Sequence, residues 1–524
     1  MATSGMRLPD ILARLEGGPS RLCFISDKGA ETLRTFDDLY RDTRALAGQL
    51  ERLGVRPGSR IGLLGPNAYP WMVWDLAIMT LGGVSVALPQ ERLAGSVAEV
   101  ASLHGLSLLV SSLDWIEPAA AGLDYVIDID ELVIAGHKRA LQPAGVLNRP
   151  GTHSLVFSSG TTGKTKGLII SASGTEKLLD LYADAFGIVD GDRLLTFLPF
   201  ANYQQRMAYY FCLYHGIDFV YVPFTRLFAG LKKYQPTYVI APPVFYESLQ
   251  NMAQSVVAPG ADGAAPLQAD IGARVAALLG GRIRYMITGM APIKRQTLDF
   301  FWRHGISLYE AFGITEAGMV AWNKPGRISL GTVGTPAEPG SVSLTEEGEV
   351  VITRDCLLSL GYFDASEEDT RSTFIGPNSV ATGDIARFDQ DGFLTIVGRK
   401  KDAIITKAGE KFHPEPIESL IQSNPAAKVA VVLGGEGLAG VVALISMPAA
   451  GDQAATATIR DEIGRINATL PVFQQVKRVE FTTLEFSIDN GFRTKNMKLN
   501  RQAIQRAYVQ HGIGLGQPIP MEVQ

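Results

Sequence analysis

Residues 158–167 read Ser-Ser-Gly-Thr-Thr-Gly-Lys-Thr-Lys-Gly, a segment whose residue types suit binding of a polyphosphate. Glycines let the backbone turn its N–H groups toward a ligand, hydroxyls add donors, and lysines add positive charge. Apolar residues flank the segment at 154–157 and 168–170, so we expect a strand, a loop and a second buried strand. A solvated surface turn is the simpler alternative. The Walker A motif is excluded, because Ser158 stands where that motif needs a glycine.

This segment resembles the phosphate-binding loop of the adenylate-forming (ANL) superfamily, which includes acyl-CoA synthetases, nonribosomal-peptide adenylation domains and beetle luciferases. The family form is close to S/T-S-G-T-T-G-K-P-K-G, and Thr165 replaces its proline. The resemblance spans about Phe36 to Arg501 and implies a site for ATP. Within the loop it assigns nucleotide contacts to Ser158, Ser159, Gly160, Thr161, Thr162, Gly163 and Lys164.

A second segment, residues 308–316, resembles the family's Y-G-x-T-E motif. The resemblance implies that Phe312 stacks on adenine, since stacking needs the ring face and not a phenol hydroxyl. It implies that Thr315 contacts a phosphate and that Glu316 holds Mg²⁺, a cation that takes few carboxylates and keeps phosphate oxygens and waters. The same motif adds Glu310, Ala311 and Gly313 to the nucleotide-binding residues.

Two more segments complete the nucleotide site that the resemblance implies. Residues 285–292 resemble the family's GGAP segment, which borders the adenine and here contains Gly289, Met290 and Ala291, with Met290 where glycine is common. Asp384 follows Thr-Gly and can accept two charge-assisted hydrogen bonds from ribose hydroxyls. Arg399 supplies donors for ribose or phosphate, and the intervening residues 388–397 read as a hairpin.

The acid-binding pocket is implied by the segment 195–202, where relatives often carry LP-x-x-H. Asn202 replaces that histidine, and an amide cannot carry charge near neutral pH. The resemblance assigns Asn202, Tyr203 and Gly318 to the pocket. The aromatic stretch 203–210 is equally compatible with a core helix and with pocket lining. No Asp stands here to pair with a substrate ammonium, which disfavours amino acids as substrates.

The C-terminal part resembles the family's small mobile domain. The resemblance implies a hinge at residues 400–402, centred on Asp402, whereas the residues alone would indicate a solvated charge run. Hinges are loop or element-terminal positions that absorb backbone rotation. Lys407, Ala408 and Gly409 resemble the loop that meets the thiol substrate in CoA ligases. Lys498 matches the family's catalytic lysine, with Lys495 as the alternative. The catalytic residues implied are therefore Lys498, Glu316 and Thr315, with Glu316 also the metal ligand.

The elements that position these residues alternate strand, helix and strand from the N-terminus onward. Residues 39–53 have helical spacing, 60–64 read as a strand, 71–81 as a buried helix and 84–88 as a strand. This alternation predicts an α/β fold with mainly parallel, helix-covered sheets. We expect a large, multi-subdomain adenylation domain over residues 1–399, a hinge at 400–402 and a small, mobile α+β domain over 403–524.

Length and composition set the remaining limits. A chain of 524 residues is too long for one core, and 46% hydrophobic with 19% charged residues is typical of a globular protein. A net charge of −5 without a basic block argues against nucleic acid as a partner. Cys23, Cys212 and Cys356 lie far apart among apolar residues, which predicts buried free thiols and a cytoplasmic location. Asp75 and Gly82-Gly83 interrupt the longest apolar run, 71–88, so we expect no integral membrane segment.

The resemblance implies ATP-dependent activation of a fatty or other apolar or aryl carboxylic acid as acyl-AMP, then transfer to a thiol. Coenzyme A is the expected thiol, and ATP and Mg²⁺ are the expected cofactors. One alternative passes the acyl group to a carrier-protein phosphopantetheine or to an amine, which would suit the departures at Thr165, Asn202 and Met290. Another is a non-catalytic nucleotide-binding relative, and a luciferase-like oxygenase is remote. The acid itself and the oligomeric state stay open.

Overall fold

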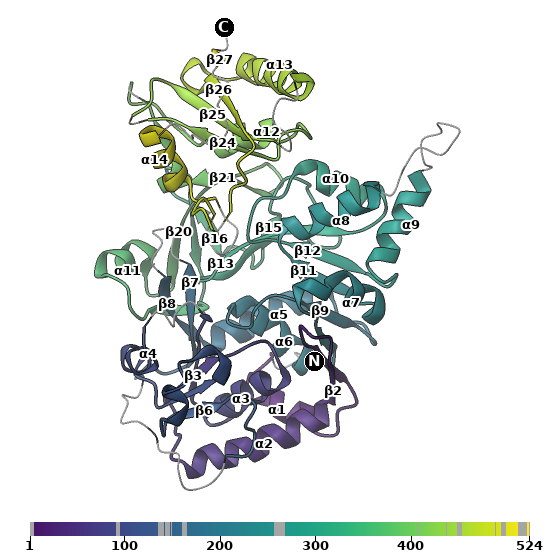
Figure 1. Ribbon diagram of the computed structural model, residues 1–524, viewed down its shortest axis with the longest axis vertical. Helices are drawn as coiled ribbons and strands as arrows, with labels where there is room; N and C mark the ends of the chain where they lie inside the picture. The colour runs from purple at the N-terminus through teal and green to yellow at the C-terminus, as the bar shows by residue number, and fades with distance from the viewer. Residues whose placement is uncertain are drawn as a thin grey trace.

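The computed structural model describes most of the chain. It covers residues 5–90, 95–134, 141, 147, 149–159, 165–255, 268–406, 408–435, 437–447, 453–487, 489–493, 499–511 and 521–522. At residues 158, 159, 165, 268–270, 511, 521 and 522 it describes the backbone alone. The chain folds into a large, sheet-rich N-terminal region and a smaller C-terminal domain, which lies at the top of Figure 1.

The first large sheet has its strands in the order β15-β14-β13-β12-β11-β9-β10-β1-β2. Its central neighbours, from β13 to β1, run parallel, and the strands at both edges pair antiparallel. The bounds are β1 Arg21–Ile25, β2 Glu31–Thr35, β9 Arg193–Thr196, β10 Asp218–Tyr221, β11 Tyr238–Ala241, β12 Tyr285–Thr288, β13 Leu308–Ile314, β14 Gly318–Trp322 and β15 Thr335–Pro336.

The second large sheet has the order β18-β8-β7-β4-β3-β5-β6. Its strands β7 to β6 run parallel. The two strands predicted around the phosphate loop are β7 and β8, and they pair antiparallel. The bounds are β3 Arg60–Leu64, β4 Val84–Ala87, β5 Leu108–Ser111, β6 Val126–Asp128, β7 Thr152–Ser159, β8 Thr165–Ser171 and β18 Ser359–Tyr362.

A third sheet, which sequence reasoning did not separate from the others, is antiparallel throughout. It orders β16-β17-β20-β19, with β21 paired to β20 as the predicted hairpin. The bounds are β16 Val342–Leu344, β17 Glu349–Thr353, β19 Phe374–Gly376, β20 Ser379–Phe388 and β21 Leu394–Arg399. This sheet lies between the two large sheets and the small domain in Figure 1, and it carries two of the predicted nucleotide residues.

Helices cover the sheets because their apolar faces need burial. α2 begins at a capping box in which Thr35 and Asp38 satisfy each other's backbone N–H groups, and α3 is buried nearly all round. In Figure 1, α2 to α4 surround the second sheet at the bottom and α7 to α10 flank the first sheet on the right. The bounds are α1 Asp10–Leu15, α2 Phe36–Arg52, α3 Tyr69–Thr80, α4 Val97–His104, α5 Ala172–Phe186, α6 Tyr203–His215, α7 Leu227–Tyr234, α8 Pro243–Ser255, α9 Gln268–Leu278, α10 Arg295–Arg303 and α11 Glu367–Thr373.

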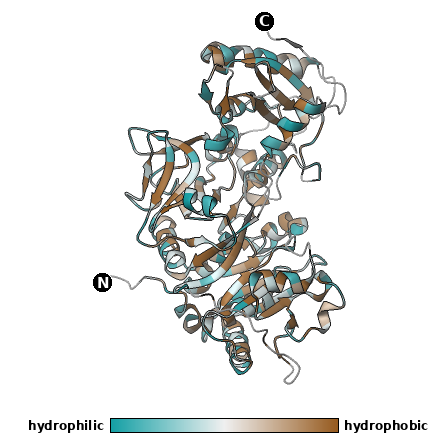
Figure 2. Cartoon of the chain, turned by 90° about the vertical axis from the view of Figure 1, so that its left-hand side faces the viewer, coloured by the Kyte–Doolittle hydropathy of each residue, from teal (hydrophilic) through white to brown (hydrophobic). Residues whose placement is uncertain are grey.

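The small domain has its own apolar cores, built only from residues between Ile404 and Tyr508. A four-stranded sheet, ordered β24-β25-β26-β27, packs against three helices. The bounds are β22 Ile404–Ile405, β23 Lys411–Phe412, α12 Glu415–Ile421, β24 Val429–Leu433, β25 Val441–Ser446, α13 Gln453–Thr469, β26 Val476–Thr482, α14 Arg501–His511 and β27 Met521–Glu522. In Figure 2 the apolar residues, in brown, gather in the strands of both regions.

These arrangements confirm the predicted fold class: mainly parallel sheets in a large α/β region, followed by a small α+β domain. The main core takes residues from both large sheets and from α1 to α6, so the two sheets form one body. One prediction is wrong. Cys23 and Cys212 are buried, but Cys356 is partly exposed because it lies in the connection from β17 to β18. Among the described residues, no helix is both long and apolar enough to cross a membrane.

Candidate active site

The predicted phosphate loop is held at its base by a strand pair whose last partners are Ser159 and Thr165. Gly160, Thr161, Thr162, Gly163 and Lys164 lie outside the described residues. Just beyond the loop, the Lys166 ammonium forms an ion pair with Asp369 of α11, at 2.7 Å between Nζ and Oδ1. The Gly167 N–H donates to Asp364 Oδ1 at 2.5 Å. These contacts therefore hold the start of β8, the strand that follows the loop, in place.

Glu316 follows β13 in the turn to β14, where it is half-buried beside Thr315. Tyr362 of β18 donates a hydrogen bond from Oη to Glu316 Oε1 at 2.8 Å, and the Ser359 N–H donates to the Glu316 carbonyl at 3.2 Å. In the described part of the chain, no lysine or arginine forms an ion pair with Glu316. A carboxylate with one neutral donor keeps its full negative charge and most of its lone pairs.

That carboxylate suits Mg²⁺ bound through phosphate oxygens. The described residues contain no group of three or more His, Cys, Asp or Glu side chains that could cage a metal by themselves. Mg²⁺ does not need such a cage, because it keeps several waters and uses one or two carboxylates together with substrate phosphates. Glu316 beside the base of the phosphate loop is consistent with this ligand set.

The glycines around Glu316 are required by close packing of the backbone. A Cβ at Gly313 would lie 2.6 Å from the Gly318 carbonyl oxygen. Gly318, predicted in the acid pocket, has a φ of 75°, and a Cβ there would lie 2.2 Å from Leu178 Cδ1. Any side chain at either position would displace the turn that presents Thr315 and Glu316. Phe312 is half-buried and packs at the edge of the core under β14.

The carboxyl end of β12 lies beside β13, with Thr288 opposite Glu310. Gly289 follows, and a Cβ there would come within 3.1 Å of the Ala311 carbonyl oxygen. Met290 has a φ of 72°, in the left-handed region that costs a non-glycine residue about 1–2 kcal/mol. This conformation explains why glycine is common at the position in relatives, and it places Met290 and Ala291 at the same strand edge as Glu310.

Glu310 is a half-buried residue within the predicted nucleotide site. Its Oε2 accepts a hydrogen bond from the Gly331 N–H at 2.9 Å. Burial raises the pKa of Glu310 to about 8, against the opposing effects of that N–H and of Arg295. Glu310 therefore carries a proton at neutral pH and brings no charge to the site.

Asp384 and Arg399, the predicted ribose residues, face each other across the β20–β21 hairpin. Arg399 Nε lies 3.0 Å from Asp384 Oδ1, and the Asp384 side chain is 5% exposed. Lys401 is exposed overall, but partial desolvation lowers the pKa of its ammonium, and Asp402, Arg399, Asp384 and Lys166 are all close enough to affect it. Lys401 therefore lies within electrostatic range of both the ribose pair and the base of the phosphate loop.

The predicted acid-pocket residues open helix α6. Asn202 is the N-cap, and its Oδ1 accepts from the Gln204 N–H at 3.2 Å. Tyr203 is buried, with its Oη 2.7 Å from His153 Nε2 and 2.5 Å from Thr175 Oγ1. Burial and the nearby Arg206 lower the pKa of His153 to about 3, so the imidazole is neutral. The phenol of Tyr203 is thus bound within the core beneath the predicted pocket.

Sequence reasoning missed a fully buried charged network directly behind α6. Arg206 donates to Asp75 of α3 from Nη2 at 2.5 Å and from Nε at 3.3 Å, and Asp75 also accepts from Tyr209 and from Tyr210. Burial alone would lower the pKa of Arg206, but Asp75 and three tyrosines raise it well above its usual value. The signal available in the sequence was Asp75, an acidic residue inside an otherwise apolar helix. Sequence reasoning used it only as an interruption of the apolar run.

The hinge prediction falls on a short 3₁₀ turn, Lys400–Asp402, directly after β21. Lys400 Nζ contacts Glu349 Oε2 at 2.9 Å and Glu347 Oε2 at 3.1 Å, both on the large region. Ala408 and Gly409 form an exposed turn before β23, whereas Lys407 lies outside the described residues.

Lys498 and Lys495 also lie outside the described residues, but the flanks of their segment are described. An isolated antiparallel bridge joins Arg493 to Leu499. Burial lowers the pKa of Arg493, and Glu247 on α8 of the large region opposes that shift. Arg493 therefore lies within electrostatic range of Glu247 on the large region.

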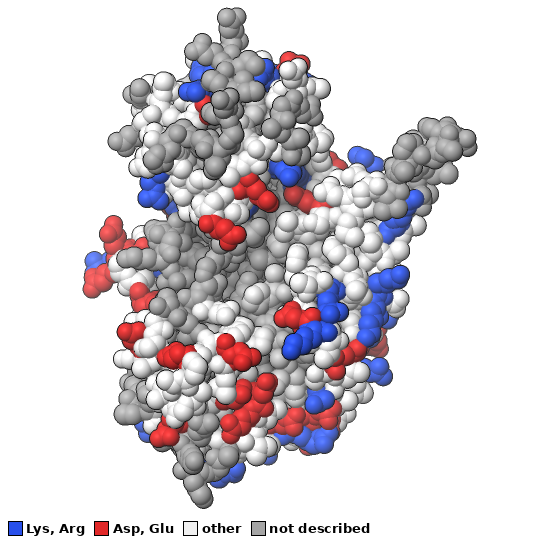
Figure 3. Space-filling model, viewed as in Figure 1, with Lys and Arg blue, Asp and Glu red and all other residues white. Residues whose placement is uncertain are grey.

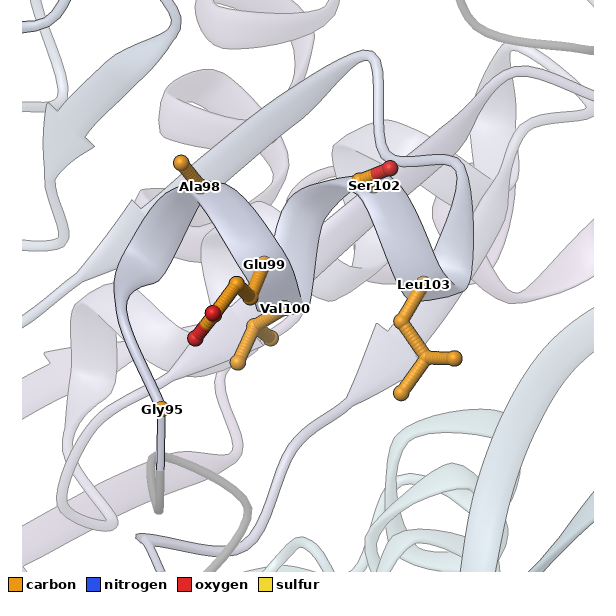
Figure 4. Close-up of a pocket in the computed structure, with 6 residues that line it drawn as sticks. All are labelled: Gly95, Ala98, Glu99, Val100, Ser102 and Leu103. Atoms are coloured by element: carbon orange, nitrogen blue, oxygen red, sulfur yellow. The ribbon is translucent and has the colours of Figure 1, made fainter.

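Two surface views set the site apart from other features. In Figure 3 acidic side chains are scattered over the lower part of this face, and basic ones lie mainly at the right, next to acidic ones. An open depression lies over one face of α4 and contains none of the predicted site residues, as Figure 4 shows. Its lining is Gly95, Ala98, Glu99, Val100, Ser102 and Leu103.

Comparison with known proteins places this geometry in context. A family profile described as AMP-binding enzyme matches residues 13–363, and one described as AMP-binding enzyme C-terminal domain matches residues 401–511. The long-chain-fatty-acid–CoA ligase FadD15 of Mycobacterium bovis is 26% identical, over 92% of each chain. The anthranilate CoA ligase AuaEII in complex with anthranoyl-AMP has a TM-score of 0.77 at 20% identity, over 98% of each chain. The o-succinylbenzoate CoA synthetase MenE of Bacillus subtilis, in complex with ATP and magnesium ion, has a TM-score of 0.71 at 20% identity, over 95% of this chain and 98% of that one.

Proposed function

Because this chain belongs to the family of AMP-binding enzymes, we propose that it uses ATP to activate a carboxylic acid as acyl-AMP and then transfers the acyl group to a thiol. The observation that carries the proposal is Glu316, a charged carboxylate without a basic partner in the described part of the chain, beside the base of the phosphate loop. The relatives with similar chains are named as CoA ligases, which supports the same reaction class here.

In the first step the acid's carboxylate oxygen attacks the α-phosphorus of ATP, and the bond to the β-phosphate oxygen breaks to release pyrophosphate. Such transfers depend mainly on positioning and on stabilising charge. Thr315 and the loop N–H groups would hold the phosphates, Asp384 and Arg399 the ribose, and Phe312 the adenine. Mg²⁺ at Glu316, when bound, supplies charge neutralisation at the phosphate oxygens.

Lys498 is the proposed cation next to the developing charge. A lysine about 4 Å away is worth roughly 4 kcal/mol at an effective dielectric near 20, which is about a thousandfold in rate. In the second step the small domain rotates about Asp402, Lys498 leaves, and Ala408 and Gly409 approach the thiol. We propose domain limits of 1–399, 400–402 and 403–524, which is consistent with the matched range 401–511 and with the separate cores of the small domain.

The acid is proposed to be a fatty, other apolar or aryl acid, with coenzyme A as acceptor. The support is the neutral Asn202 at the start of α6 and the CoA ligases among the relatives. Acid-dependent ATP–pyrophosphate exchange should be measured across fatty, aryl and amino acids, followed by product analysis with CoA, with holo-carrier protein and with neither. Exchange with amino acids alone, or acyl transfer only to the carrier protein, would overturn the corresponding part.

The two-step scheme is tested with Lys498→Ala. We expect adenylation to fall by about a thousandfold, whereas thioester formation from supplied acyl-AMP is retained. Lys495→Ala is the matched control and should retain both half-reactions. An equal loss of both half-reactions in folded Lys498→Ala protein would contradict the scheme, and loss of adenylation in Lys495→Ala instead would move the assignment to that lysine.

A further inference from the structure

Tyr362 links the proposed cation ligand to the base of the phosphate loop. It lies on β18, which pairs antiparallel with β8, so that Tyr362 is opposite Leu168, two residues after Lys166. Its Oη donates to Glu316 Oε1 at 2.8 Å and approaches Thr373 Oγ1 at 3.5 Å. The Lys166 ammonium lies 5.0 Å from the centroid of its ring. One side chain thus touches groups that arrive from two different sheets.

The hydroxyl of Tyr362 is a neutral and permanent donor. A phenol has an ordinary pKa of about 10, so it keeps its proton at physiological pH and can donate its hydrogen bond. A phenol fixes one carboxylate oxygen without cancelling the carboxylate's charge, whereas a lysine or arginine would pair with that charge. Glu316 Oε1 is occupied in this way, which leaves Oε2 as the oxygen that can face a cation.

The ring of Tyr362 has a second effect, on the neighbouring ammonium. Lys166 is only 18% exposed, and it is held between the ring face and Asp369 Oδ1, 2.7 Å away. Asp369 is itself 43% exposed and belongs to α11. A cation is therefore present on the same tyrosine as Glu316, but its partners in the described part of the chain are an aromatic face and another carboxylate. This arrangement keeps Lys166 from neutralising Glu316.

We propose that Tyr362 is a positioning residue for the divalent-cation carboxylate: its hydroxyl aims Glu316, and its ring holds Lys166 away from it. The inference rests on the proposed role of Glu316 in binding Mg²⁺. Hydrogen-bond partners of this kind orient metal ligands, and their loss lowers metal affinity by about 10–100-fold.

Tyr362→Phe tests the proposal because it removes the hydroxyl and keeps the ring, including its edge contact with Phe374 at 5.2 Å. Mn²⁺ binding, followed by electron paramagnetic resonance in the presence of a non-hydrolysable ATP analogue, should weaken by about tenfold. In ATP–pyrophosphate exchange, the Mg²⁺ concentration for half-maximal rate should rise by a similar factor, with a smaller change in the rate at saturating Mg²⁺. Unchanged Mn²⁺ affinity in folded protein would overturn the proposal.

Tyr508→Phe is the matched control, because Tyr508 Oη also donates to a glutamate, Glu480, at 2.7 Å, but within the small domain. It should leave Mn²⁺ affinity unchanged, and an equal loss there would mean that the Tyr362 effect is a general loss of stability. Glu316→Gln provides the second background. If Tyr362 acts through Glu316, Tyr362→Phe should have no further effect on Mn²⁺ affinity in that background, and an undiminished effect would overturn the proposal.

These measurements separate the positioning role from the proposed function. Wild-type Mn²⁺ affinity and exchange rate in Glu316→Gln would contradict the cation-binding role of Glu316 itself, and the positioning role would fall with it. Weakened binding in Glu316→Gln together with normal binding in Tyr362→Phe would overturn the positioning role alone.

Discussion

Asp75 and Glu316 both accept hydrogen bonds from tyrosines, but the other groups around the two carboxylates differ. Asp75, 1% exposed, accepts from Tyr209 and Tyr210 and is paired with Arg206 through two guanidinium nitrogens. Glu316, half-buried at the turn after β13, accepts from Tyr362, and no basic partner is present in the part of the chain that is described.

The difference separates a structural carboxylate from one available to a ligand. At Asp75 the charge is neutralised and the lone pairs are used, so nothing is left for a substrate. Arg206 extends the network to Ser85 of β4 at 2.6 Å and Ser154 of β7 at 2.5 Å, which ties α3 and α6 to the second sheet. At Glu316 the charge is kept and one oxygen is fixed, which is what a bound cation requires.

The largest expected effect is a loss of protein stability when Asp75 loses its arginine partner. Arg206→Met leaves Asp75 buried and unpaired, and breaking a buried pair in this way costs about 3–5 kcal/mol. Urea unfolding followed by circular dichroism should show this loss, or the variant should fail to accumulate as folded protein. The double variant Asp75→Asn/Arg206→Met removes both charges and should recover part of the loss. Full stability of Arg206→Met would contradict the structural role.

At Glu316 we expect the opposite pattern, with a loss of activity and little change in stability. Glu316→Gln should lower acid-dependent ATP–pyrophosphate exchange by about a hundredfold, as is typical when one charge-stabilising group is removed. Its free energy of unfolding should stay within about 0.5 kcal/mol of the wild type, because no partner at Glu316 is left as an unpaired charge. A large drop in stability would place Glu316 in the same class as Asp75.

A third carboxyl, Glu310, sharpens the comparison because it avoids charge altogether. Its pKa is about 8 in the folded protein, raised from 4.5 by burial, so the folded state holds a proton that the unfolded chain releases. This group's contribution to the free energy of unfolding therefore falls as pH rises from 4.5 to 8 and is constant above that range. Between pH 7 and pH 8 we expect the wild type to lose about 1 kcal/mol relative to Glu310→Gln. The prediction would be refuted if urea unfolding gave the same difference in free energy of unfolding between the two proteins at both pH values.

Local patterns in the sequence were sufficient for most of the fold. The capping residues Thr35 and Asp38, the apolar alternation through β3, α3 and β4, and the Asp-Gly turn between β20 and β21 all act over a few residues. The structure supplies a packing reason for two of the motif glycines: Gly313 and Gly318 touch backbone or side chains that leave no room for a Cβ.

The two networks could not be predicted from the sequence, because their members are distant along the chain. Asp75 and Arg206 are 131 residues apart, and Glu316 and Tyr362 are 46 apart. Without their distant partners, Asp75 and Glu316 each look like an ordinary polar residue in the sequence. Only folding shows which carboxylate is supplied with an arginine and which is not. The assignment of Lys498, outside the described residues, stays a prediction.

The smallest effect is expected from removing one of the several hydrogen-bond donors around Asp75. Tyr210→Phe deletes a 2.6 Å hydrogen bond to Asp75 but leaves Tyr209 and both nitrogens of Arg206 in place. The carboxylate stays neutralised and hydrogen-bonded, so the loss should be about 0.5–1 kcal/mol, near the net value of one hydrogen bond. Urea unfolding resolves a change of this size when the two proteins are compared side by side. A loss above about 3 kcal/mol in the free energy of unfolding would mean that Asp75 depends on every one of its hydrogen-bond donors. The larger number of donors at Asp75 would then not distinguish it from Glu316.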